Sequence, residues 1–69
     1  MTQATEIMYS ASNANSAMET AEKLTNNIDQ DWEHEATFYT FEDESVLVVS
    51  GPQLNAYESM EAARASFEE

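Results

Sequence analysis

The segment Asp29-Gln30-Asp31-Trp32-Glu33-His34-Glu35 places four carboxylates at alternate positions, beside the one histidine of the chain. Carboxylates at the first, third and fifth positions of a loop open the EF-hand calcium pattern. The sixth position then holds His34, where glycine makes the turn, and the twelfth holds Thr40, where a bidentate glutamate is required. One imidazole with Asp31 or Glu35 is also a poor zinc donor set, because zinc sites combine more nitrogen or sulfur ligands. We therefore expect solvated carboxylates here, with no metal ion and no cofactor.

Catalysis is equally poorly supported by the residue types present. A pair of carboxylates performs acid–base chemistry when a cleft raises the pKa of one of them by burial. A chain of 69 residues has little room for such a cleft. The chain has no cysteine and a single glycine, which disfavours a catalytic thiol and a glycine-rich phosphate loop. We expect a protein that is not an enzyme.

Charge is the strongest signal in the sequence. There are 14 acidic side chains and 2 basic ones, which give a formal net charge of −12 at pH 7. Lys23 and Arg64 alone cannot engage a nucleic-acid backbone or an anionic membrane surface, so direct binding to either is excluded. The longest apolar run, Val46-Leu47-Val48-Val49, is far too short to span a bilayer. The expected partner is a basic protein surface.

The alternation of Asp29, Asp31, Glu33 and Glu35 suits such a partner. In an extended segment these carboxylates point to one side, with successive ones about 6.6 Å apart. DNA presents phosphates about every 3.4 Å along each strand. A row of carboxylates can therefore occupy a groove built for a phosphate backbone and accept hydrogen bonds from its Arg and Lys side chains. A plainer interpretation also stands, in which the acidic residues only keep a small domain in solution.

The elements that must position these carboxylates begin with a helix. Apolar residues recur every three or four positions between Ser10 and Ile28, which predicts an amphipathic helix capped by Ser12 or Asn13. Residues before Ser10 either extend that helix upstream or form a short edge segment. We expect Trp32 to pack the following acidic loop onto the core, and the alternative is an exposed anchor for a partner.

Strands and a second helix follow. Glu42, Asp43 and Glu44 form the polar turn of a predicted antiparallel hairpin. The predicted fold is α+β: an N-terminal helix, a three-stranded antiparallel meander and a C-terminal helix, with both helices on one face of the sheet in a single two-layer domain of residues 1–69. The predicted elements are strands at 37–41, 46–49 and 53–57, a break at Ser50-Gly51-Pro52 and a closing helix at 58–67.

Several of these residues together resemble a known family. The pattern over residues 17–56 is similar to that of a phage-encoded type I-F anti-CRISPR inhibitor, a small acidic DNA mimic. Small acidic inhibitors of type I-C systems are similar in kind, so the subtype stays open. Pro52 and Leu54 depart from the family, which has polar residues in that strand. The residues that carry the resemblance are Asp29-Gln30, Trp32, Tyr39-Thr40-Phe41, Asp43, Ser45-Val46-Leu47 and Ser50-Gly51.

The resemblance implies a phage protein in the cytoplasm of an infected bacterial host. It implies binding to a basic DNA-binding surface of the type I surveillance complex, called Cascade, and exclusion of target DNA. We expect the protein to act as a monomer. The alternatives are a DNA mimic directed at a restriction enzyme, nucleoid protein or repressor, and an acidic structural protein. The expected partner-binding residues are Asp29 and Asp43 from the matching pattern, Glu42 and Glu44 beside the hairpin turn, and Asp31, Glu33 and Glu35 from charge alone.

Overall fold

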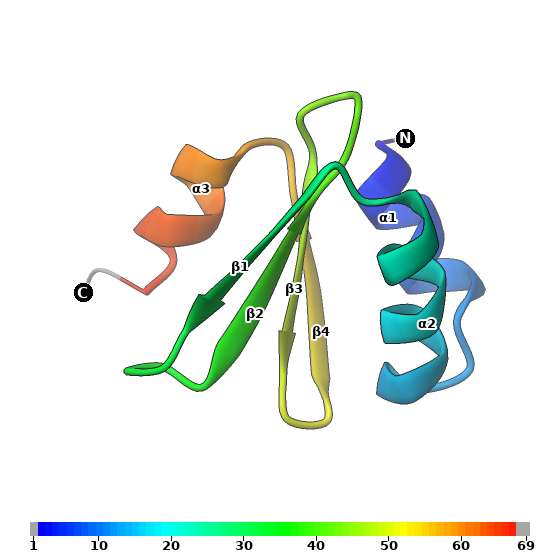
Figure 1. Ribbon diagram of the computed structural model, residues 1–69, viewed down its shortest axis with the longest axis horizontal. Coiled ribbons are helices and arrows are strands. Elements are labelled where there is room, and N and C mark those ends of the chain that lie inside the picture. Colours follow the sequence, from blue (N-terminus) through cyan, green and yellow to red (C-terminus); the bar gives the residue numbers. More distant parts are fainter. Residues whose placement is uncertain (1, 68–69) are drawn as a thin grey trace.

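The structure is a computed structural model that describes residues 2–67. Within this range it contains three helices and a four-stranded antiparallel sheet, in which spatial neighbours are also neighbours along the chain (Figure 1). The elements are α1 (Gln3–Ser10), α2 (Ala14–Leu24), β1 (Asn27–Asp31), β2 (Ala36–Thr40), β3 (Val46–Ser50), β4 (Gln53–Tyr57) and α3 (Met60–Ala65). The α+β class and the three predicted strands are confirmed, and a fourth strand precedes them.

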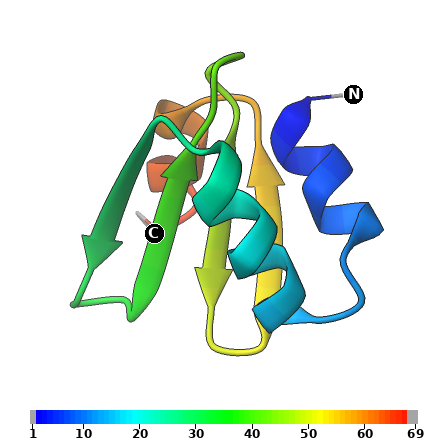
Figure 2. The ribbon, with the colours of Figure 1, turned by 45° about the vertical axis from the view of Figure 1, so that its right-hand side comes forward.

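Helices cover both faces of the sheet. α1 and α2 lie on one face and α3 lies on the other (Figure 2). The predicted two-layer arrangement, with both helices on one face, is therefore wrong. The reason lies in β3, where Val46 and Val48 face α3, Leu47 and Val49 face α1 and α2, and all four side chains are buried. A strand that is apolar on both faces needs a covering layer on each.

Each layer has its own core, and the sheet supplies the large side chains of both. The helices contribute mainly alanines, so their backbones approach the sheet closely. The core between the sheet and α1–α2 contains Ala4, Ile7, Ala17, Ala21, Tyr39, Phe41, Leu47 and Val49. The core under α3 contains Ala36, Phe38, Val46, Val48 and Ala63.

The predicted helix from Ser10 to Ile28 is two helices in the structure. α1 ends at Ser10, and Ala11 is extended; α2 then begins after Asn13, whose side chain accepts a hydrogen bond from the Ser16 N–H at 2.8 Å. Asn13 is thus the cap, as one of the two predicted alternatives had it. The residues upstream of Ser10 form their own helix, which neither proposed alternative described.

The C-terminal end of α2 is earlier than predicted because Thr25 turns the chain into the sheet. Its hydroxyl is 2.7 Å from the Asn27 carbonyl oxygen and 2.8 Å from that of Thr40. Ile28 therefore lies in β1 rather than on the helix, opposite Tyr39 of β2. The closing helix is shorter than the predicted 58–67, because Ser59 caps it.

Candidate partner-binding surface

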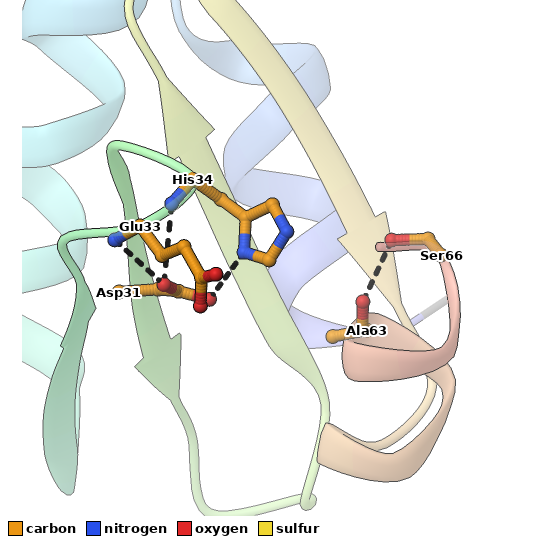
Figure 3. Close-up of polar contacts among 5 residues, drawn as sticks. All are labelled: Asp31, Glu33, His34, Ala63 and Ser66. Atoms are coloured by element: carbon orange, nitrogen blue, oxygen red, sulfur yellow. Dashed lines mark hydrogen bonds and ion pairs between the residues drawn. The ribbon is translucent and has the colours of Figure 1, made fainter. Parts of the chain in front are cut away.

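The turn between β1 and β2 is closed by the carboxylate of Asp31. This carboxylate accepts hydrogen bonds from the N–H groups of Glu33 at 3.1 Å and His34 at 3.2 Å, and it contacts His34 Nδ1 at 2.8 Å (Figure 3). The side-chain hydrogen bond with His34 is the main cause that lowers the pKa of Asp31, and burial partly opposes it. Asp31 is therefore engaged within its own turn.

The expected one-sided row of carboxylates forms only in part. Asp29 and Asp31 lie in β1 opposite Phe38 and Ala36, so both face the α3 side of the sheet. Glu33 and Glu35 lie beyond the end of the strand, in the turn, and both are exposed. Alternation ends there because the turn replaces the extended backbone, with Glu35 at a φ of 53°.

An aromatic contact holds this turn against Phe67, two residues past the end of α3. The His34 and Phe67 ring centroids are 4.9 Å apart, and those of Phe38 and Phe67 are 5.6 Å apart. The Arg64 guanidinium carbon lies 5.3 Å from the centroid of the Phe38 ring. Arg64 thus packs on an aromatic face and forms no ion pair with a carboxylate in the described residues.

Trp32 lies at the tip of the turn with 81% of its surface exposed. The prediction that it packs the acidic loop onto the core is therefore wrong, and its position matches the alternative of an exposed anchor. The turn places Trp32 past the end of β1. Gln30, Glu35 and Thr37 line an open hollow of about 290 Å³ together with its indole.

The second expected group lies in the turn between β2 and β3. Asp43 accepts hydrogen bonds from the Gln3 N–H at 2.7 Å and the Ser45 N–H at 3.0 Å, and from the Ser45 hydroxyl. The Ser45 side chain, and then the Gln3 N–H, lower the pKa of Asp43. Asp43 therefore ties the hairpin to the beginning of α1, while Glu42 and Glu44 beside it are exposed.

The two groups of expected site residues lie at opposite ends of β2. The 29–35 group adjoins the beginning of this strand, and the 42–44 group follows its end (Figure 1). A strand of five residues spans about 17 Å. The fold brings the members of each group together and keeps the two groups apart.

A third region combines the expected Asp43 with Glu6, which was not among the expected site residues. A shallow groove of about 880 Å³ lies between α1, α2 and the hairpin turn, with Glu6 and Asp43 on its rim. Its apolar lining includes Tyr9 and Leu24, which are 71% and 47% exposed. The sequence signal that could have identified this region is the helical spacing of Ala4 and Ile7, which are buried. A helix with these two residues on its apolar face leaves Tyr9 exposed beside the groove.

The carboxylates are the common feature of all three regions. Every described Asp and Glu side chain is exposed or half-buried. Within residues 2–67 the one contact between a basic and an acidic side chain joins His34 to Asp31, and neither Lys23 nor Arg64 pairs with an acidic group. In the same range no cluster of three or more metal-ligating side chains occurs, and no helix is long and apolar enough to cross a membrane.

The described elements define a small, strongly acidic α+β protein with helices on both faces of an antiparallel sheet. No family model, no curated protein and no solved structure matches the chain. Arguments about function therefore depend on the surface itself.

Proposed function

We propose that the protein is a DNA mimic that binds the basic DNA-binding surface of a type I Cascade complex and blocks target DNA binding. The observation that carries the proposal is the unneutralised acidic surface: no described carboxylate is buried, and none pairs with Lys or Arg. Such carboxylates are available to accept charge-assisted hydrogen bonds from the cationic side chains of a partner. Like charges at this density oppose folding, so the acidic surface must confer an offsetting benefit, which this proposal assigns to binding.

The size of the molecule supports the same proposal. Its longest dimension is 29 Å, which corresponds to about eight phosphates along one DNA strand. The two expected groups lie about 17 Å apart, which corresponds to about five phosphates. A groove that holds a DNA backbone can therefore contact both ends of the sheet.

Cascade is proposed as the partner from the resemblance to type I-F anti-CRISPR inhibitors, with the type I-C complex as the other subtype. The protein would then act as a monomer in the cytoplasm of an infected bacterial host, without catalysis. A DNA mimic directed at a restriction enzyme, nucleoid protein or repressor would use the same surface. These partners differ in the arrangement of their cationic residues, so competition experiments separate them.

A gel-shift competition tests the proposal. Purified type I-F and type I-C Cascade are incubated with the protein and then with labelled target DNA. We expect loss of the DNA complex, an intact Cascade, and an inhibition that falls steeply as salt rises. Undiminished DNA binding at saturating protein, for both complexes and for a panel of other DNA-binding proteins, would refute DNA mimicry.

Charge-neutral variants then locate the surface. Glu33, Glu35, Glu42 and Glu44 are exposed, and only backbone N–H groups of Glu33 and Glu44 help to close the turns. Their side chains form no hydrogen bond within residues 2–67, so a change to Gln preserves the fold. We expect this variant to inhibit at least roughly tenfold more weakly. The matched control also removes four charges, three from α2 and α3 and one from the residue before the α3 cap, with Gln at Glu19, Glu22, Glu61 and Glu58. Equal losses in the two variants would mean that net charge alone drives binding.

A further inference from the structure

The outer edge of β1 has no partner in the described chain. β1 is the first strand of the sheet and pairs only with β2. None of the three described helices packs closely on it, whereas α1 packs beside β4 at the opposite edge (Figure 2). An edge strand presents a row of backbone N–H and C=O groups that another strand can pair with.

The two faces of this edge differ in chemistry. Ile28 faces the α1–α2 side and is 46% exposed, and Gln30 and the indole of Trp32 continue this surface. Asp29 lies on the other face, where it accepts a hydrogen bond from the Asn27 side chain at 3.2 Å. A strand added here therefore meets an apolar and aromatic surface on one side and a carboxylate on the other.

We propose that an extended cationic segment of a protein partner pairs with β1 as a fifth strand. Its Arg or Lys side chains would meet Asp29 on one face, and its apolar side chains would pack on Ile28 and Trp32 on the other. A second copy of this chain is the wrong occupant, because its own Asp29 and Asp31 and its net charge of −12 would face the same charges. Charge complementarity selects a basic strand.

The edge contact rests on the proposed function in one respect: both require a partner protein with a cationic surface. The probe is a synthetic peptide of about eight residues in which arginine and valine alternate. The control peptide has the same sequence with every backbone amide N-methylated, which keeps all charges and removes the donors of strand pairing. Binding is followed by amide chemical shifts of the isotope-labelled protein.

We expect the unmodified peptide to perturb the amides of 27–31 and the Trp32 side chain, and to bind at least roughly tenfold more tightly than the N-methylated peptide. Trp32→Ala should weaken binding several-fold, whereas Tyr9→Ala, which removes an aromatic side chain of similar exposure on α1, should leave it unchanged. Equal affinity for both peptides, or shifts confined to the hairpin turn at 42–44, would overturn the proposal.

Peptide binding and Cascade inhibition, measured on the same protein, separate this proposal from the proposed function. If the unchanged protein fails to pair with the peptide but fully inhibits Cascade, the edge contact is refuted and DNA mimicry stays in place. Peptide pairing at β1 without any inhibition of DNA binding would retain the edge contact and refute the mimicry. Self-association of the protein through β1, detected by concentration-dependent shifts without peptide, would overturn the assignment of a cationic occupant.

Discussion

Among the serine-to-alanine changes in this chain, Ser45→Ala should cause the largest loss in the free energy of unfolding. The Ser45 side chain is fully buried, and its Oγ accepts a hydrogen bond from the Ala4 N–H at 3.1 Å; Ala4 is also fully buried. Without the hydroxyl, this N–H has no acceptor at the beginning of α1. A buried donor left without its partner costs about 1–3 kcal/mol.

That loss is large for a domain of this size. Small domains have about 0.05–0.15 kcal/mol of stability per residue, or about 3–10 kcal/mol here. A loss of about 2 kcal/mol lowers the melting temperature by about 8–16 °C. Urea denaturation and thermal melts followed by circular dichroism measure it, since Trp32 is too exposed to report unfolding.

The control is Ser12→Ala, because Ser12 is exposed and its side chain forms no hydrogen bond within residues 2–67.

The pH dependence of the free energy of unfolding supplies a second test. The lowered pKa of Asp43 means that its contribution is present above the ordinary value of 3.8 and is lost as pH falls through the lower folded value. Ser45→Ala removes the main cause of that pKa shift. The difference in the free energy of unfolding between Ser45→Ala and Ser12→Ala should therefore become smaller below pH 3.8. Equal stability of the two variants at neutral pH would refute the role assigned to Ser45.

Three further predictions concern packing, backbone and charge. Leu47→Ala, at a fully buried position in β3, should cost about 2–5 kcal/mol in denaturant unfolding. Gly51→Ala should cost about 1–2 kcal/mol although a Cβ would have open space, because the φ of Gly51 is +58°. The melting temperature should rise as ionic strength increases from about 0.01 M to about 0.15 M, because screening weakens repulsion among the carboxylates. A fall over the same range would mean that attractive ion pairs dominate.

The sequence allowed the central strands to be predicted because their composition is distinctive. Thr37 to Phe41 and Val46 to Val49 are aromatic and β-branched, and such residues favour the pleated, buried surface of a sheet. β1 was missed because its residues are polar apart from Ile28, and an edge strand needs little apolar surface. The third layer could have been inferred from the run at Val46–Val49, which is too apolar for a strand with one solvated face.

The candidate site was predictable by residue type but not by geometry. Asp31 was expected to point outward from an extended segment, and instead it accepts backbone hydrogen bonds that close a turn. The structural contacts of Asp43 could not be inferred locally, because its donor on Gln3 lies 40 residues away in sequence. Trp32 was misplaced because an aromatic side chain beside acidic residues is compatible with either a core or a surface position.

The contacts of Ser45 and Asp43 with α1 also determine the order in which the fold can be completed. During synthesis α1 lacks the acceptors for its Gln3 and Ala4 N–H groups until the β2–β3 turn has been made, 40 and 41 residues later. A helix of eight residues is marginal in water on its own. α1 should therefore become stable only after the hairpin forms. It should be among the last elements to fold and among the first to open in hydrogen exchange.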